Sequence, residues 1–246
     1  MAGNPKIYRD IGKKARDLLH KGFEPPQPWT QFSFLDMNCG TTSIFQLDNV
    51  IPGINTRFKL CLPDPHRLSK VEFQFFHDLA GFTAGLGLRP KPLLHFSGVY
   101  GTRFFAFGAD MSFDTKRADF FKFDAGVSFT AASVNASVAL TDRFETILAT
   151  AFCTMDPRTQ TGVGAEYRYN IMKGKSGIYI GTQYALSPST MLKARVSNHG
   201  VVSGLVQLMV QSDLASVITS EIDTRDLTKR PKFGVTMSFK PQITHL

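Results

Sequence analysis

The stretch RFFAFGADMSFDTKRADFFKFDAGVSF, residues 103–129, contains two runs in which apolar and polar side chains alternate strictly. A period of two is the pattern of a β-strand, because successive side chains of a strand point to opposite faces. One face of each run is apolar and rich in Phe, and the other face carries small or charged residues. The apolar residues are Phe105, Phe107, Ala109, Met111 and Phe113 in the first run and Phe121, Phe123, Ala125, Val127 and Phe129 in the second.

The same alternation continues through most of the chain after the proline-rich segment EPPQP at residues 24–28. It recurs in INTRFKLCL (54–62), KVEFQFF (70–76), VGAEYRYN (163–170) and KFGVTMSFK (232–240). We expect about sixteen strands of about ten residues, which is the length and rhythm of a transmembrane β-barrel. No linker or change of composition divides the chain, so we predict one domain, with a helix at 1–22 and a barrel at 23–246.

A soluble β-sandwich also alternates apolar and polar residues, and it remains the competing fold. Two features favour the membrane barrel: the polar face is rich in charge and Gly, and the apolar face is rich in Phe in strand after strand. The 246 residues include 22 Phe but only one Trp. No run of 18 apolar residues predicts a transmembrane helix, and no apolar segment near the start predicts a secretory signal.

The net charge of +8 favours anionic partners, and half of it comes from the first 21 residues. There, KIYRDIGKKARDLLHKG (6–22) is the one clear amphipathic helix pattern, which we expect to span residues 6–20. It could be a targeting peptide, a membrane-surface anchor or a working part of the protein. Asp10 and Asp17 disfavour the targeting peptide, since such peptides are poor in acidic residues.

No motif in the chain indicates catalysis, a metal site or a cofactor. The six His residues show no metal-ligand spacing, and we expect each to be either hydrogen-bonded within the fold or solvated. Neither a phosphate-binding glycine loop nor a nucleophile motif is present. Basic and aromatic residues interleave with period two and therefore lie on opposite faces. A platform that stacks nucleic-acid bases needs both on one face, so we expect no dedicated nucleic-acid binding and no enzyme activity.

Three stretches resemble the voltage-dependent anion channels, the porins of mitochondria, and their plant branch in particular. They are YRDIGKKARDLLHKG (8–22), LRPKPLLHFSGVYGTRFFAFGADMSFDT (88–115) and YALSPSTMLKARVSNHGVVSGL (184–205). The last follows the family pattern at Tyr184, Pro188, Thr190, Ala194, Arg195, Val196, Ser197, Asn198 and Ser203. It departs from the pattern at Ser187, where Asp is usual, and at Gly204, where an aliphatic residue is usual.

The resemblance implies a voltage-dependent, anion-favouring channel of the mitochondrial outer membrane that passes ATP, ADP, organic acids and ions. The plastid envelope stays open as a second location. KFGVTMSF is similar to the C-terminal sorting signal of mitochondrial barrels at Lys232, Gly234, Met237 and Phe239. The family barrel has 19 strands. We expect this chain to be shorter by about three strands after the helix, and a barrel of sixteen strands would close with an antiparallel pair.

The alternation predicts which charged residues would line the pore. The basic candidates are Arg57, Lys59, Lys70, Lys122, Arg168, Lys193 and Arg195, and the acidic ones are Glu72, Asp110, Asp124 and Glu166. By resemblance, the N-terminal segment is a gating helix that lies in the lumen, with Gly22 as its hinge, although a glycine there is also typical of a helix C-cap. Its predicted gating residues are the basic Arg9, Lys13, Lys14 and Arg16 and the apolar Ile7, Ile11 and Leu18.

The shortened chain motivates an alternative function, a non-conducting barrel that serves as a membrane scaffold or docking receptor. The expected partners are membrane lipids, weakly held transported anions and nucleotides, the mitochondrial barrel-assembly machinery and further copies of the chain. The sequence leaves open the direction of the closing strand pair and whether the shortened barrel conducts.

Overall fold

The computed structural model describes residues 7–23, 41–51, 54–62, 70–88, 92–156, 161–211, 214–226 and 231–239. These ranges contain a 3₁₀ turn, η1 (Tyr8–Asp10), one α-helix, α1 (Lys13–Leu19), and fifteen strands. The strands are β1 (Thr41–Ile51), β2 (Ile54–Leu62), β3 (Lys70–Phe76), β4 (Ala80–Gly87), β5 (Leu93–Gly101), β6 (Phe105–Asp114), β7 (Asp119–Thr130), β8 (Val134–Thr141), β9 (Thr146–Asp156), β10 (Thr161–Asn170), β11 (Lys175–Ser187), β12 (Thr190–Ser197), β13 (Val201–Gln211), β14 (Leu214–Asp223) and β15 (Lys232–Phe239).

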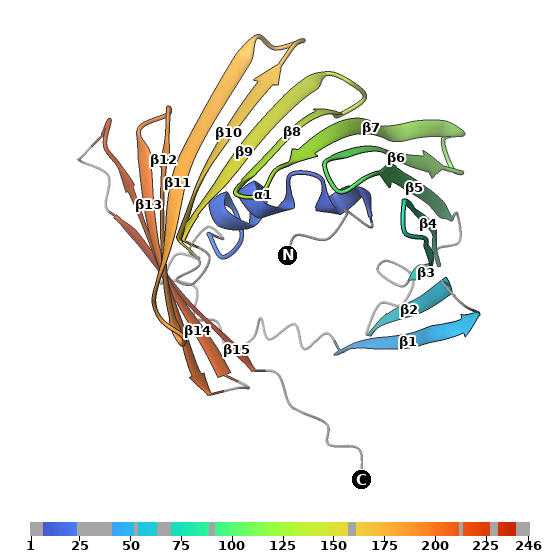
Figure 1. Ribbon diagram of the computed structural model, residues 1–246, viewed down its shortest axis with the longest axis horizontal. Coiled ribbons are helices and arrows are strands. Elements are labelled where there is room, and N and C mark those ends of the chain that lie inside the picture. The colour runs from blue at the N-terminus through green and yellow to red at the C-terminus, as the bar shows by residue number, and fades with distance from the viewer. Residues whose placement is uncertain are drawn as a thin grey trace.

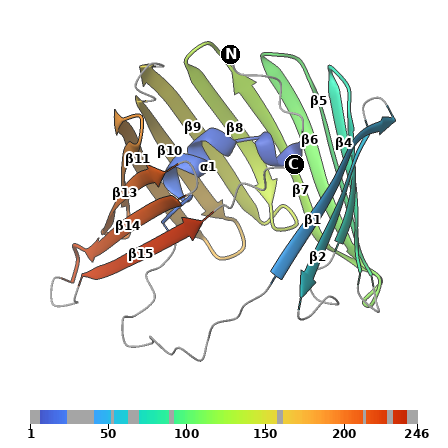
Figure 2. The same cartoon turned by 90° about the horizontal axis from the view of Figure 1, so that it is seen from below.

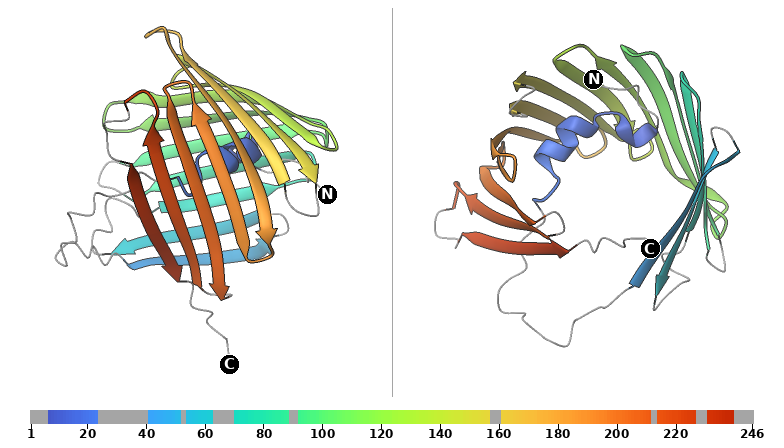
Figure 3. Two further views of the ribbon diagram at one scale, coloured as in Figure 1. Left: turned by 90° about the vertical axis from the view of Figure 1, so that its left-hand side faces the viewer. Right: turned by 60° about the horizontal axis from the view of Figure 1, so that its bottom comes forward.

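All fifteen strands form one sheet in chain order, and each strand is antiparallel to the next. The sheet curves into a barrel wall, and the helical segment lies inside it (Figure 1). Further views show the same wall with the helix within (Figures 2 and 3). The architecture is the expected transmembrane antiparallel β-barrel.

The described ranges hold fifteen strands where the sequence predicted about sixteen. An odd number has a consequence for direction: because every neighbouring pair is antiparallel, β1 and β15 run the same way. These two strands are the ends of the sheet in the part of the chain that the structure describes. The segment EPPQP, residues 24–28, lies outside the described residues.

The two faces of the sheet have opposite character. Large apolar side chains are exposed on the outer face, for example Phe107 at 55% and Ile180 at 54%. The inner face carries polar residues that are buried against the helix or their neighbours, among them Asp110, Asp124 and Glu166. A soluble β-sandwich would show the reverse, with apolar residues inside. This arrangement therefore suits a wall with lipid outside and water or polar groups inside.

The predicted continuous helix over residues 6–20 is wrong, because the structure breaks it into η1 and α1. Gly12 separates them with a φ of +67°, a left-handed conformation that favours glycine. The Asp10 carboxylate accepts a hydrogen bond from the Ile7 N–H at 3.2 Å and so caps the 3₁₀ turn. No helix in the described ranges is long and apolar enough to cross a membrane.

Candidate functional site: the inner face of the barrel and its helix

The helical segment lies with its apolar side on the inner wall. Ile11, Ala15, Leu18 and Leu19 have exposed fractions of 4% or less, and together with Phe152 of β9 they make up much of the small apolar core. This is the apolar stripe that the sequence predicted, with Ile7 only half-buried at its start. Burial of this stripe is the main force that holds the helix in the lumen, because apolar surface removed from water stabilises the contact.

Four glycines on the inner face of β6, β7, β10 and β11 make room for this stripe. We name them the glycine seat: Gly108, Gly126, Gly164 and Gly181. A Cβ at Gly181 would lie 2.7 Å from Leu19 Cδ2, and a Cβ at Gly108 would lie 2.9 Å from Ile11 Cδ1. Both distances are too short for ordinary packing, so a larger residue at either position would push the helix from the wall.

The break at Gly12 also fits the wall beneath it. Ser137 of β8 and Thr150 of β9 share a hydrogen bond of 2.7 Å between their hydroxyl groups. A Cβ at Gly12 would lie 2.7 Å from Ser137 Oγ and 2.9 Å from Thr150 Oγ1. Two features therefore require a glycine at position 12: its left-handed backbone conformation, and its close approach to the hydroxyl groups of Ser137 and Thr150.

The C-terminal end of α1 is held by charged groups of the wall. Lys193 Nζ donates to the carbonyl oxygen of Asp17 at 2.8 Å, and Arg195 Nη1 donates to that of Leu19 at 2.8 Å. His20 Nε2 lies 2.8 Å from Glu166 Oε2, whose side chain is only 1% exposed. Two of the predicted basic pore residues therefore contact the helix rather than facing open water.

The other charged candidates of the wall form ion pairs with one another. Lys122 Nζ lies 2.6 Å from Asp110 Oδ2 and 3.0 Å from Asp124 Oδ2, so one ammonium group serves two carboxylates. His95 Nδ1 lies 3.3 Å from the other oxygen of Asp110. Because the positive charge of Lys122 is balanced locally, it adds little to the field in the middle of the lumen.

Two further ion pairs each join two of the predicted wall residues on the same strand. Lys70 Nζ lies 2.5 Å from Glu72 Oε1, and Arg168 Nη2 lies 3.4 Å from Glu166 Oε1. The Arg168 side chain is 56% exposed, which makes it the most open of the basic wall candidates whose ion pairs we describe. The side chains of Arg57 and Lys59 lie outside the described part of the structure, but the strand register places Arg57 opposite Glu72 and Lys59 opposite Lys70.

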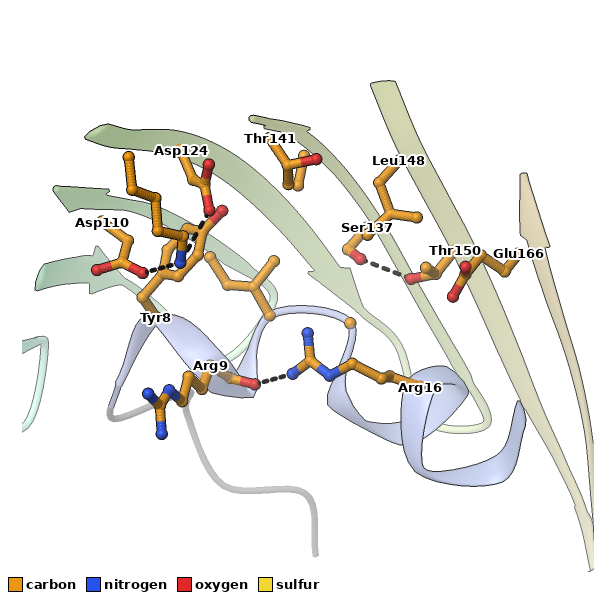
Figure 4. Close-up of a pocket in the computed structure, with 14 residues that line it drawn as sticks. Tyr8, Arg9, Arg16, Asp110, Asp124, Ser137, Thr141, Leu148, Thr150 and Glu166 are labelled. Carbon is orange, nitrogen blue, oxygen red and sulfur yellow. Dashed lines mark hydrogen bonds and ion pairs between the residues drawn. The ribbon is translucent and has the colours of Figure 1, made fainter. Parts of the chain in front are cut away.

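A cavity of about 320 Å³ lies between the helical segment and the strands β6–β10 (Figure 4). Both signs of charge line it, with Arg9 and Arg16 from the helix side and Asp110, Asp124 and Glu166 from the wall. Tyr8 also lines it, and burial, together with Asp124 and Asp110, raises the pKa of the Tyr8 phenol above its ordinary value. The phenol therefore stays neutral at physiological pH and adds no charge to the lumen.

The basic residues of the helical segment are accessible to water. Arg9, Lys13, Lys14 and Arg16 are exposed, and Lys13 pairs only loosely with Asp10, at 3.4 Å. Arg16 also donates to the carbonyl oxygen of Arg9, a contact that ties α1 to η1. Of the four basic gating candidates, Arg9 and Arg16 line the cavity of Figure 4, and Lys14 Nζ lies 5.9 Å from the centre of the Phe152 ring.

The remaining predicted positions are Gly22 and four residues of the last strand. Gly22 has a φ of +90°, and a Cβ there would lie 2.7 Å from Leu205 Cδ1, so the position requires glycine three residues after α1 ends. Lys232, Gly234, Met237 and Phe239 all lie in β15. The hinge and sorting roles of these residues stay predictions.

Sequence reasoning missed two groups of residues that hold the helix. His20 is one of the hydrogen-bonded histidines that the sequence allowed, but its partner Glu166 lies 146 positions away, and no local pattern predicts that pairing. The glycine seat did leave a signal, since Gly108, Gly126, Gly164 and Gly181 all occupy inner positions of alternating strands. Glycine inside a strand often marks a close approach by another part of the chain.

Comparison with known proteins agrees with this architecture. The family model described as "Eukaryotic porin" matches residues 31–234. The chain is 33% identical to the mitochondrial outer membrane protein porin of 34 kDa from Solanum tuberosum, with 98% of this chain and all of that protein covered. It is 32% identical to mitochondrial outer membrane protein porin 1 of Arabidopsis thaliana over the same shares, and 29% identical to the outer plastidial membrane protein porin of Pisum sativum.

The alignment to the potato protein spans 277 positions, whereas this chain has 246 residues. At least 31 aligned positions therefore have no counterpart here, which is the size expected for about three missing strands.

Solved barrels share the fold at low sequence identity. A mutant of the Rh. blastica porin matches with a TM-score of 0.54 and 9% identity, covering 81% of this chain and 86% of that one. A structure titled "Asymmetric conductivity of engineered proteins" matches with a TM-score of 0.56 and 9% identity, covering 81% of this chain and 88% of that one. Given the matched family model and relatives above 30% identity over nearly the whole chain, the chain belongs to the eukaryotic porin family.

Proposed function

We propose that the chain is a voltage-dependent, anion-favouring channel of the mitochondrial outer membrane that passes small hydrophilic metabolites such as ATP, ADP and organic acids. Membership of the porin family makes it a non-enzymatic channel. The observation that carries the proposal is the pairing of an apolar outer face with a charged inner face on one continuous sheet. A wall of this kind separates lipid from an aqueous path.

The anion preference follows from the charges that remain unbalanced in the lumen. Residues 7–23 carry five basic and two acidic side chains, a net charge of +3, and the basic ones are exposed. On the wall, Lys70 is balanced by Glu72, and Lys122 faces the two carboxylates of Asp110 and Asp124, which leaves one negative charge in excess there. The helix therefore supplies much of the positive field that would concentrate anions in the pore.

The same charge gives a physical basis for voltage dependence. One elementary charge that moves through 100 mV changes its energy by about 2.3 kcal/mol. A helical segment with a net charge of +3 that shifts through even part of the membrane field would respond to voltages of this order. The contacts described between the helix and the wall are non-covalent, so such a shift needs no change in the barrel wall.

Location and partners extend the proposal. Relatives are named for the mitochondrial outer membrane, and one is named for the outer plastidial membrane, so imaging of the tagged protein beside both envelopes decides between them. We propose lipids, weakly bound nucleotides and further copies of the chain as partners. The last strand, β15, would be read by the barrel-assembly machinery during insertion.

Recordings in planar lipid bilayers test the function. Purified, folded protein should give stepwise currents, a reversal potential of the sign set by chloride in a KCl gradient, and closure as the voltage rises. The alternative of a non-conducting scaffold, motivated by the shorter chain, predicts membrane insertion without current. A current with a cation-type reversal potential would contradict the proposed selectivity while leaving the channel itself intact.

A further inference from the structure

Two basic residues of β12, Lys193 and Arg195, do something other than line an open path. Each donates a hydrogen bond of 2.8 Å to a backbone carbonyl of the last turn of α1, Asp17 and Leu19 respectively. Carbonyl groups in the last turn of a helix have no partner within the helix, and they form the negative end of its dipole. Cationic donors at this point satisfy both the hydrogen bonds and the charge.

A third wall residue grips the same end of the helix. Glu166 of β10 lies 2.8 Å from His20, the C-cap of α1, and its carboxylate is almost fully buried. The His20 ring also packs against the Tyr179 ring of β11 in a T-shaped arrangement, with 5.5 Å between the ring centroids. The grip therefore spans three adjacent strands, β10, β11 and β12, and does not depend on one contact.

The guanidinium group of Arg195 makes an additional contact beyond the helix end. It lies 4.4 Å from the centre of the Phe23 ring, a distance suited to a cation–π interaction. Phe23 is buried, and it follows Gly22, which itself rests against Leu205 of β13. Arg195 thus fixes both the last carbonyl of α1 and the chain that leaves it.

The other end of the segment is held differently. Ile11 and Tyr8 rest on Gly108 of the wall through apolar contacts, with Ile11 Cδ1 2.9 Å from a Cβ placed there. Apolar contacts of this kind are not directional, whereas hydrogen bonds from charged donors fix a position and an orientation. The C-terminal end is therefore where the orientation of the helix is determined.

We propose that Glu166, Lys193 and Arg195 form a clamp, a set of positioning residues that holds the C-terminal end of α1 on the wall in the open channel. The clamp sets the voltage at which the channel closes. The charges of Lys193 and Arg195 interact with the carbonyl groups at the end of α1, so they contribute little to ion selectivity. The inference rests on the proposed function, because it assigns a role within gating.

The test compares the double variant Lys193→Met/Arg195→Met with the matched control Lys116→Gln/Arg117→Gln. Both remove one lysine and one arginine, but the control residues lie in the exposed turn between β6 and β7, far from α1 in sequence and fold. At a fixed voltage we expect the open-to-closed ratio of the clamp variant to fall roughly tenfold, with a reversal potential equal to that of the control. The conservative variant Lys193→Arg/Arg195→Lys keeps both cationic donors and should restore the ratio.

A spin label on the helix separates positioning from general stability. Cys39, Cys61 and Cys153 are replaced by Ser, and Lys13, whose side chain is 56% exposed, becomes the single labelled Cys. The label should become more mobile in the clamp variant and stay unchanged in the control, while the circular dichroism of the barrel stays the same in both. Because the label reports without current, it tests the clamp even if wild-type protein fails to conduct, an outcome that would overturn the proposed function alone.

A reversible lock gives a second test that needs none of the clamp substitutions. A Cβ at Gly164 would lie 3.5 Å from Leu18 Cδ1, so the thiols of Leu18→Cys/Gly164→Cys would face each other across the contact between the helix and the wall. Joining them with a short bis-methanethiosulfonate cross-linker should abolish voltage closure, and reduction should restore it. Unchanged closure in the locked channel, or a clamp variant that shifts the reversal potential and leaves closure untouched, would overturn the inference.

Discussion

At the scale of single residues, the position of the helix depends on glycines, which have no Cβ atom to collide with their neighbours. Gly181 of β11 has no side chain, and Leu19 of α1 occupies the space where one would be. A hydrogen in place of a methyl group therefore decides whether the helix can reach the wall. Gly12 and Gly108 repeat this arrangement toward the other end of the segment.

The substitution Gly181→Ala should destabilise the protein by about 1–3 kcal/mol, because overpacking forces shifts in a close-packed contact. The added Cβ would lie 2.7 Å from Leu19 Cδ2 and 2.8 Å from the carbonyl oxygen of Ala194. Unfolding by denaturant in detergent micelles measures the loss.

Gly98→Ala is the matched control for this prediction. Gly98 is also a strand glycine, but the nearest heavy atom to an added Cβ is Phe82 Cδ2 at 4.0 Å. We expect this variant to unfold like wild type or slightly later. Equal losses in both variants would mean that glycine matters here for the strands and not for the helix.

At the scale of elements, the sequence predicted the strands well and the helix less well. Alternation in residues 103–129 gives β6 and β7, and the glycine, serine and charged positions of both runs face inward as expected for a barrel. This succeeds because a strand's two faces follow from a period of two alone. The break at Gly12 could not be predicted, since it depends on Ser137 and Thr150 more than 120 positions later.

The site shows the same division between local and distant information. The alternation identified Asp110, Lys122 and Asp124 as inward residues, and they form one ion-paired group across β6 and β7. It could not show that Lys193 and Arg195 bind the helix, because those hydrogen bonds join residues 176 positions apart. Only the folded barrel brings these residues together.

Two adjacent positions of β13 test which face of the sheet meets lipid. Val206 pairs with Leu192 and Ile218 on the outer face, whereas Gln207 lies on the inner face at the same depth. Val206→Lys should lower the folding free energy in phospholipid vesicles by about 2–4 kcal/mol, the cost of a cation near the middle of a bilayer. Gln207→Lys should cost less than about 1 kcal/mol. The reverse order would contradict the assignment of the two faces.

The helix can be tested as the source of anion preference. The double variant Lys13→Glu/Lys14→Glu makes the lumen charge more negative at the first turn of α1. The helix should stay folded, because the helix dipole favours acidic residues at this end. We expect the reversal potential in a KCl gradient to move strongly toward the cation side. Lys116→Glu/Arg117→Glu changes the charge equally in the exposed turn after β6 and should move it little. A larger shift in this control would place the selective field at the rim of the barrel.

At the scale of the whole molecule, the strand number is the quantity that the sequence left least certain. We expected about sixteen strands and left the direction of the closing pair open, and the described ranges hold fifteen strands, with β1 and β15 in the same direction. A count that differs by one reverses the relative direction of the terminal strands, because each antiparallel neighbour flips the chain. Local patterns predict each strand well. An error of one in the number of strands nevertheless reverses the relative direction of the first and last strands of the barrel.

The whole-molecule account is that of a narrow member of the porin family whose lumen is shared with its own helix. The chain lacks at least 31 positions of the alignment to its potato relative, and barrel diameter falls with strand number. The charged helix face then lies close to any solute that passes. The shorter barrel should therefore depend more on its helix, for both selectivity and closure, than on its wall.

Release of entrapped solutes from liposomes tests the central claim, that this barrel is an open path for small anions, most directly. Vesicles that contain ATP and a high-molecular-mass dextran are reconstituted with the purified protein, and insertion and folding are confirmed by protease protection and circular dichroism. The account predicts that ATP escapes while the dextran is retained. Retention of ATP by vesicles that carry inserted, folded protein would contradict it.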